Sequence, residues 1–285
     1  MQQANFLDVP NCKVSPCKVS PPLKWAGGKR WLVPRLRELY QPHRHRRMVI
    51  PFAGGIGDLL GLCPEQALVN DTNVHLMNFY RWWREGLDAD EYPDLFQNNQ
   101  DAFLKNRRNF NELIDRYGGA NTKDAAILFY YLLRTCFNGL CRFNGTGHFN
   151  VGYGKYKAID YNAWLRGYHI PDGWEFTCGD FSLLRVHRYS SRNQTADYVY
   201  CDPPYDNGFV GYSVGGFPWQ SQIDLVEWLH DHQGPVCISN AATARIINLY
   251  REFGYQVEML DAPRRISCDG NRDMCIEVLA YKNIV

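Results

Sequence analysis

The chain has 285 residues, of which 45% are hydrophobic and 14% aromatic, and its formal net charge is +1. This length and hydrophobic content suffice for a sizeable core, organised as one large domain or as one domain with a large insertion. The near-zero charge neither requires nor excludes a polyanionic partner. No apolar run approaches the length of a transmembrane helix, and the N-terminus lacks the apolar core of a signal peptide, so we expect a soluble cytoplasmic protein.

The N-terminal third predicts the start of an α/β sheet. Residues 1–20 predict a flexible tail, and a short helix is expected within 27–39, after a glycine pair. The apolar run at 47–52 predicts a strand that breaks into the glycine-rich turn PFAGGIGD, followed by a helix and by a second strand ending at Asp71. This order of elements is typical of a doubly wound α/β sheet.

The middle of the chain changes to helical periodicity. Helices are predicted at 74–86, 102–117 and 123–136, and the segment 137–156, FNGLCRFNGTGHFNVGYGKY, predicts a β-hairpin because glycine pairs punctuate alternating aromatic and polar residues. Arg134 to Arg166 is almost free of acidic residues, and basic residues interleaved with aromatics favour nucleic acid binding.

The last part of the chain returns to strands. They are predicted at 174–179, 197–202, 235–240, 255–260 and 275–281, with helices between several of them. We therefore expect an α/β domain formed by residues 21–74 and 166–285, which a helical insertion at 75–165 interrupts before ending in the β-hairpin.

The ten cysteines are not spaced as C-x-x-C, and several stand in apolar segments, as Cys201 and Cys237 do. Buried free thiols are the favoured interpretation, and disulfides or a metal site are the alternative. Cys12 and Cys17 in the repeated CKVS segment are expected to be exposed, and a zinc role for them is weakly supported. The histidines lack ligand spacing, so no metal site is predicted.

The glycine-rich turn and Asp71 predict a ligand site. Glycines let a backbone approach a ligand closely. Asp71 follows Gly54 by 17 residues at the end of the next strand, where a carboxylate can accept hydrogen bonds from ribose hydroxyls. By itself this pattern is compatible with a nicotinamide, a flavin or S-adenosylmethionine.

The segment YVYCDPPYDN at 198–207 predicts a rigid corner after a strand, because two prolines remove two backbone donors and fix two φ angles. One interpretation is a plain turn in which Asp202 makes a local cap. The other is a site for an exocyclic amine, whose two hydrogens the Asp202 carboxylate and the Pro203 carbonyl would accept. The lone pair of the nitrogen would then point at an electrophilic methyl group, and Tyr205 would stack on the flipped base.

These segments together resemble the Dam-type DNA adenine-N6 methyltransferases of the D12 class, over residues 21–285. The motifs that carry the resemblance are PLKWAGGK (22–29), PFAGGIG (51–57), LVND (68–71), the segment at 137–156, FTCGDF (176–181), YCDPPY (200–205), ISN (238–240) and RRISCDGNRDMCIEVLAYK (264–282). The resemblance implies a Rossmann-like methyltransferase sheet with a helical target-recognition insertion. It also implies methyl transfer from S-adenosylmethionine to a flipped adenine in duplex DNA, by an enzyme that works as a monomer.

The resemblance implies three sets of site residues. Trp25, Lys29, Phe52, Gly54, Gly57, Asp71 and Asp202 would contact or enclose S-adenosylmethionine. Asp202, Pro203 and Tyr205 would hold the adenine. Lys24, Asn138, Leu140, Arg142 and Lys155 would contact DNA. For Trp25 the alternative is core packing, and for Arg142 it is a phosphate contact in place of base recognition.

Two positions depart from the members that recognise GATC. Gly152 stands where those members carry a proline, and Lys155 stands where they carry an arginine, which keeps the charge but loses the bidentate fork. The expected target is therefore GATC or a GATC-like site. The alternatives are a cytosine-N4 or RNA adenine methyltransferase and a catalytically degenerate DNA-binding relative. A nicotinamide dehydrogenase is a further alternative, in which DPPY would have no role.

Overall fold

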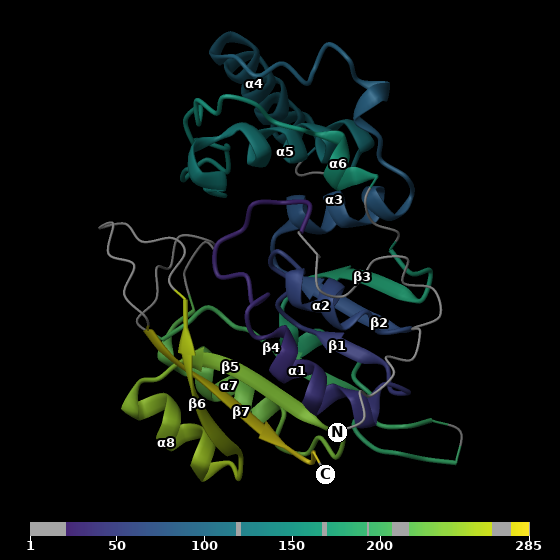
Figure 1. Cartoon of the computed structure of the whole chain (residues 1–285), viewed down its shortest axis with the longest axis vertical. Coiled ribbons are helices and arrows are strands. Elements are labelled where there is room, and N and C mark those ends of the chain that lie inside the picture. Colours follow the sequence, from purple (N-terminus) through teal and green to yellow (C-terminus); the bar gives the residue numbers. More distant parts are fainter. Residues whose placement is uncertain are drawn as a thin grey trace, which may run out of the picture.

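A computed structural model describes residues 21–117, 121–166, 170–192, 194–206, 217–263 and 275–284. The predicted tail with Cys12 and Cys17, and residues 264–274 of the last motif, lie outside the described residues. A seven-stranded sheet in the order β3-β2-β1-β4-β5-β7-β6 forms the centre of the molecule (Figure 1). Its strands are β1 (Met48–Ile50), β2 (Ala67–Asp71), β3 (Trp174–Cys178), β4 (Tyr198–Cys201), β5 (Val236–Ala241), β6 (Gln256–Ala262) and β7 (Cys275–Lys282).

The sheet has the topology expected of a Rossmann-like fold. Strands β1 to β5 pair in parallel, and β7 lies antiparallel between β5 and β6. The chain order changes direction between β1 and β4, and ligands of open α/β sheets bind outside the carboxyl ends of the strands at such a switch point. The α/β class and all seven predicted strands are confirmed.

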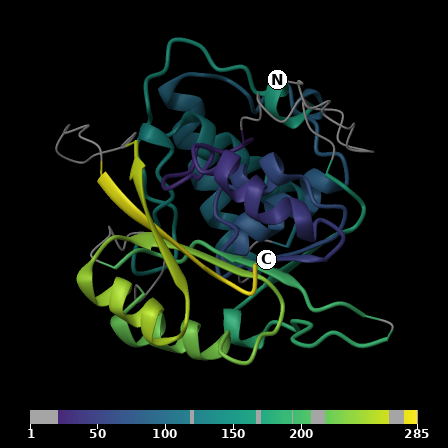
Figure 2. The same cartoon turned by 60° about the horizontal axis from the view of Figure 1, so that its bottom comes forward.

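Alternating side chains of the strands face two separate cores. In β1, Met48 and Ile50 belong to one core while Val49 belongs to the other, as the two-residue period of a strand requires. The first core is covered by α1 (Val33–Tyr40), α2 (Gly57–Leu62) and α3 (Val74–Arg84), and the second by α7 (Trp219–Trp228) and α8 (Ala244–Glu252). Figure 2 shows the purple α1 and the yellow-green α8 on opposite sides of the sheet.

The helices between β2 and β3 form a layer beyond one end of the sheet (Figure 1). This layer contains α4 (Gln100–Tyr117) and α5 (Lys123–Thr135), both close to their predicted ranges. Helix α3 joins the layer to the sheet, because the Phe79 ring stacks on Tyr130 of α5 and the Tyr80 ring stacks on Phe176 of β3. None of the described helices is long and apolar enough to cross a membrane.

The predicted β-hairpin at 137–156 is not formed as two strands. A short 3₁₀ turn, η3 (Phe137–Gly139), opens the segment. The pairing that follows consists of two isolated antiparallel bridges, Cys136 with Tyr153 and Phe143 with Phe149. Backbone hydrogen bonds also join the two arms, from the Asn144 N–H to the His148 carbonyl and from the Asn150 N–H to the Arg142 carbonyl. Side chains of α4 hold the second arm: the Asn111 side chain bonds both the N–H and the C=O of Phe149, and Arg107 donates to the Val151 carbonyl. The segment is thus a bridged loop that docks on α4.

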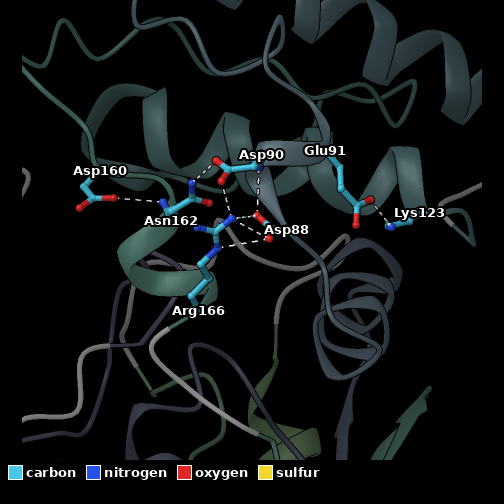
Figure 3. A network of polar contacts seen from close by, with 7 residues as sticks. All are labelled: Asp88, Asp90, Glu91, Lys123, Asp160, Asn162 and Arg166. Atoms are coloured by element: carbon cyan, nitrogen blue, oxygen red, sulfur yellow. Dashed lines mark hydrogen bonds and ion pairs between the residues drawn. The ribbon is translucent and has the colours of Figure 1, made fainter.

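A polar network ties the chain that follows α3 to the chain that precedes β3 (Figure 3). The network connects η2 (Ala89–Glu91) with α6 (Asn162–Leu165) and α5. Its pairs are Arg166 with Asp88 and Asp90, Asn162 with Asp90, and Lys123 with Glu91. Arg166 contacts both oxygens of Asp88, at 2.9 and 2.8 Å. Because such solvent-exposed pairs contribute little to stability individually, the network acts mainly by fixing geometry.

The seven cysteines in the described part of the chain are free thiols. Cys136, Cys141, Cys201 and Cys237 are buried, which confirms the prediction for Cys201 and Cys237. Burial raises the pKa of the Cys237 thiol to about 12, so it stays protonated and unreactive.

Candidate active site

The carboxyl ends of the parallel strands bring the predicted motifs to one edge of the sheet. Phe52 follows β1, Asp71 ends β2, Gly179 follows β3, Asp202 follows β4 and Asn240 stands near the end of β5. Since β1 and β4 are direct neighbours, the glycine-rich turn and the DPPY corner lie side by side at the switch point.

Asn70 joins three of these strand ends and was not identified from the sequence. Its side-chain amide donates to the carbonyls of Pro51, at 3.0 Å, and Gly179, at 2.9 Å, and its oxygen accepts from the Thr177 hydroxyl at 3.1 Å. The residue is buried, so these bonds offset the cost of removing the amide from water. An asparagine inside the apolar strand LVND was the available signal.

Asp71 holds the glycine-rich turn in place. Its Oδ2 accepts from the Gly54 N–H at 3.0 Å, and its Oδ1 accepts from the Asn73 N–H at 2.9 Å. Burial raises the pKa of Asp71, and the backbone donors oppose that rise. Each carboxylate oxygen can accept more than one hydrogen bond, so acceptor capacity remains for ligand hydroxyls. The Tyr80 hydroxyl donates to the Gly54 carbonyl at 2.6 Å from the other side.

The glycines of the turn make room for Trp25. A Cβ on Gly54 would lie 3.2 Å from the Trp25 Nε1, and a Cβ on Gly55 would lie 2.8 Å from the Trp25 Cβ. Gly54 also has a φ of +46°, which favours glycine. The partly exposed indole thus rests on the turn, and its predicted contact with the cofactor remains a prediction. At Gly57 a Cβ would lie 3.1 Å from the Arg30 Cγ.

Phe52 forms an aromatic wall beside the turn. Its ring centroid lies 5.6 Å from those of Phe181 and Phe217. Phe181 belongs to the motif FTCGDF, although no role was assigned to it from the sequence. A wall of this kind can accept the flat face of an adenine ring.

Lys29 is the cation at the centre of the DPPY corner. Its Nζ lies 3.2 Å from Asp202 Oδ2 and 3.9 Å from Glu277 Oε2, and it donates to the Gly27 carbonyl at 2.7 Å. The same Nζ lies 4.5 Å from the Tyr205 ring centroid. Only 4% of the residue is exposed, so the ammonium is buried, while the Asp202 and Glu277 side chains remain 20% and 14% exposed.

Two further contacts hold the corner residues. The Ser239 hydroxyl donates to Asp202 Oδ1 at 2.6 Å, so the Asp202 carboxylate is fixed from two sides. The Tyr205 hydroxyl donates to Glu277 Oε2 at 2.6 Å, which orients the Tyr205 ring. Both partners were missed from the sequence, although ISN contains Ser239 and Glu277 interrupts the apolar strand CIEVLAY.

The charges at the corner do not balance. Asp58, Asp202 and Glu277 all act electrostatically on Lys29. Burial alone would lower the pKa of Lys29, but the attraction of Asp202 and Glu277 outweighs it and raises that pKa. Burial and the nearby Asp202 charge raise the pKa of Asp58 to about 6, and burial also raises the pKa of Glu277. The cluster therefore holds three carboxyl groups around one buried cation.

Four of the five predicted DNA-contacting residues belong to segments that meet at Lys24. The Lys24 Nζ lies 3.4 Å from the centre of the Tyr156 ring, and a Cβ on Gly139 would lie 2.3 Å from the Lys24 Cβ. Lys24 therefore packs between Tyr156 and η3. The other three predicted residues are adjacent in sequence to these contact residues: Asn138 and Leu140 flank Gly139, and Lys155 precedes Tyr156.

Arg142 lies further along the loop. Its guanidinium donates to the Asn150 side chain at 2.8 Å and to the Asn150 carbonyl at 3.2 Å, so the exposed cation braces the two arms of the loop. Asn138 and Lys155 have φ angles of +53° and +55°, which turn the backbone sharply at both ends of this surface.

Comparisons with known proteins identify the family of the chain. A sequence model of the D12 class N6 adenine-specific DNA methyltransferases matches residues 25–261. The chain is 34% identical over 262 residues to a DNA N-6-adenine-methyltransferase of Escherichia phage P1, covering 87% of this chain and 33% of that protein. It is 32% identical to the retron Ec67 DNA adenine methylase of Escherichia coli, over 90% of each chain. It is also 32% identical to a Vibrio cholerae DNA adenine methylase, over 90% of this chain and 94% of that one. The chain thus belongs to the D12 class of N6 adenine-specific DNA methyltransferases.

Proposed function

We propose that the chain transfers a methyl group from S-adenosylmethionine to N6 of an adenine that is flipped out of duplex DNA at GATC or a GATC-like site. The observation that carries the proposal is the rigid corner after β4, where Ser239 and Lys29 fix the Asp202 carboxylate beside the glycine-rich turn. A carboxylate and a carbonyl next to each other form an acceptor pair for the two hydrogens of an exocyclic amine.

The residues present fit S-adenosylmethionine. The excess of carboxylates over cations around Lys29 suits a ligand that carries a positive sulfonium and a positive ammonium group. Asp71 would accept from the ribose hydroxyls, and the other predicted cofactor residues, Trp25, Phe52, Gly54 and Gly57, line the same edge of the sheet. When bound, this donor supplies the electrophilic methyl carbon.

The corner residues would orient the amine for attack. Asp202 and the Pro203 carbonyl each accept one hydrogen of the adenine N6 amine, and the Tyr205 ring stacks on the base with its hydroxyl anchored by Glu277. The N6 lone pair, drawn out of conjugation with the ring, forms the new N–C bond as the methyl–sulfur bond breaks. The Asp202 carboxylate stabilises the positive charge that develops on N6, and one N6 proton then leaves to solvent.

Residues 75–165 would form the target-recognition region, and residues 21–74 with 166–285 the catalytic domain. Lys24, Asn138, Leu140, Arg142 and Lys155 would contact the duplex, with Arg142 and Lys155 suited to phosphate or guanine. We expect the enzyme to act as a monomer on double-stranded DNA in the cytoplasm.

The direct test is to identify the methylated nucleoside. Plasmid DNA from a methylation-deficient strain is incubated with the purified chain and isotopically labelled S-adenosylmethionine, digested to nucleosides and separated. We expect N6-methyladenine, at positions that modification-sensitive sequencing locates within one short motif. N4-methylcytosine, or label transferred only to RNA, would overturn the proposal in favour of another amine acceptor. Absence of transfer together with intact DNA binding would indicate a degenerate relative.

A further inference from the structure

Behind the DPPY corner lies a chain of buried side-chain hydrogen bonds that the proposed chemistry does not use. The Gln222 side-chain amide on α7 donates to the Pro204 carbonyl at 2.8 Å. Asn240 on β5 donates to the Gln222 side-chain oxygen at 3.0 Å and to the Tyr250 hydroxyl at 3.1 Å. Gln222 is 1% exposed, and Asn240 and Tyr250 are fully buried.

The same asparagine also fixes the end of the corner. Its Oδ1 accepts from the Asp206 N–H at 3.2 Å, directly after Tyr205. The Asp206 carboxylate in turn accepts from the Thr243 hydroxyl at 2.9 Å and from the Arg245 Nε at 2.6 Å, at the start of α8. The corner is thus held at Asp202 by Ser239, at Pro204 by Gln222 and at Asp206 by Asn240.

A proline corner needs this kind of support. Pro203 and Pro204 have no N–H groups, so neither can donate a backbone hydrogen bond that orients the corner. The ψ angle of Pro203 is restricted because a proline follows it, whereas the ψ angle of Pro204 is left free. The bond from Gln222 fixes the direction of the Pro204 carbonyl and with it the plane of the next peptide. Throughout the described part of the chain, no donor contacts the Pro203 carbonyl oxygen, which leaves it available to an incoming amine.

We infer that Gln222, held by Asn240 and Tyr250, is a positioning residue that turns the Pro204 carbonyl away so that the Pro203 carbonyl faces the target amine. This inference rests on the proposed function, because it assigns a purpose to the Pro203 carbonyl in methyl transfer. It also assigns a role to the motif ISN: Ser239 orients the carboxylate of the acceptor pair, and Asn240 orients the carbonyl through Gln222.

The test compares two substitutions of similar size, Gln222→Met and Gln222→Glu. Gln222→Met removes the donor, and we expect kcat to fall by about 10- to 100-fold because the acceptor pair is misplaced. The Kd for S-adenosylmethionine should stay within about twofold of the wild-type value, since Gln222 does not belong to the proposed S-adenosylmethionine site. In Gln222→Glu the ionised carboxylate cannot donate to Pro204, whereas the protonated form can.

The pH profile of Gln222→Glu separates positioning from mere folding. Burial raises the pKa of the introduced carboxyl. The ratio of the kcat of Gln222→Glu to that of the wild type should therefore rise as the pH falls from 8.5 to 6. A ratio that does not change with pH, or a kcat near that of the wild type in Gln222→Met, would overturn the inference. The exposed Gln220 lies on the same helix, and Gln220→Met and Gln220→Glu serve as matched controls with unchanged kcat.

Gln222→Asn covers the case in which the two larger changes prevent folding. This variant keeps a buried amide, but its side chain is one methylene shorter and no longer reaches the Pro204 carbonyl. We therefore expect kcat to fall while thermal unfolding stays cooperative. An unchanged kcat would contradict the inference. Total methyl transfer to nucleic acid by the wild type tests the proposed function separately from the comparison of the variants. A wild type that methylates another amine would refute adenine as target and still leave the variant ratios to decide the role of Gln222.

Discussion

The Lys29 ammonium lies 3.2 Å from Asp202 Oδ2 and 3.9 Å from Glu277 Oε2, so one buried cation joins the N-terminal segment, the corner after β4 and strand β7. Removing one partner from a buried, charged cluster leaves the others unpaired in a medium of low dielectric. This relationship makes the corner sensitive to any change of charge.

Lys29→Met should destabilise the fold by about 3–5 kcal/mol at pH 8 and abolish methyl transfer, because three carboxylates lose their common cation. The loss of stability should be smaller at pH 5, where Asp58, with a pKa of about 6, takes up a proton. Chemical denaturation at the two pH values measures the difference. The exposed Lys123, paired with Glu91, provides the control: Lys123→Met should leave the melting temperature unchanged.

Asp58→Asn should stabilise the protein at pH 7.5 and have little effect at pH 4.5. The folded-state pKa of Asp58 is about 6, above the ordinary value of 3.8. The folded state therefore binds more protons between these two values, and stability is lost as the pH rises through about 6. A shift of this size corresponds to on the order of 1–3 kcal/mol.

Melting curves of both proteins across this pH range measure the effect. Asp224→Asn, which removes a solvent-exposed carboxylate on α7, serves as the control variant. A stabilisation by Asp58→Asn that did not grow with pH would show that the buried carboxylate carries no penalty.

Tyr205→Phe should lower kcat by about tenfold while the ring remains able to stack, because loss of a hydrogen bond to a charged group costs about 1.5–3 kcal/mol. The hydroxyl bonds Glu277, so Glu277→Gln should weaken the same interaction. The double variant should therefore lose less than the product of the two single losses. Strictly multiplicative losses in kcat would mean that the two residues act separately.

Lys155→Ala should weaken DNA binding uniformly across sequences and reduce the slope of log Kd against log salt by about one. Lys24→Met should instead reduce discrimination between target and non-target duplexes, because Lys24 is half-buried against Tyr156 and η3. Fluorescence anisotropy at several salt concentrations separates the two behaviours. Arg251→Ala, on the exposed side of α8, should change neither quantity. Identical effects of both lysines would indicate phosphate contacts only.

The strands were predictable because their signals are local. The apolar runs before Asp71 and Asp202 end in glycine, proline or a carboxylate, and these residues mark strand ends whatever the tertiary context. The rule that parallel strands place their carboxyl ends at one edge then brought Asp71 near the glycine-rich turn, where its carboxylate accepts from Gly54.

The remaining features depend on contacts between distant segments. Nothing near Glu277 indicates that it pairs with Lys29, and nothing near Gln222 indicates a bond to Pro204. The predicted hairpin is present only as two isolated antiparallel bridges, and no local pattern indicates that Asn111 of α4 bonds the Phe149 backbone. The alternation of apolar and polar residues indicates which face of a strand is apolar. It does not indicate which side-chain donor from another segment will bond a given backbone carbonyl.

The central claim is that the Asp202–Pro203 corner holds the target amine against the methyl donor, and a crystal structure with duplex DNA and S-adenosylhomocysteine tests it most directly. We predict that the flipped adenine N6 lies within hydrogen-bonding distance of both the Asp202 carboxylate and the Pro203 carbonyl, and that the N6 lone pair points toward the sulfur. An adenine bound elsewhere, or a sulfur remote from the corner, would contradict the account.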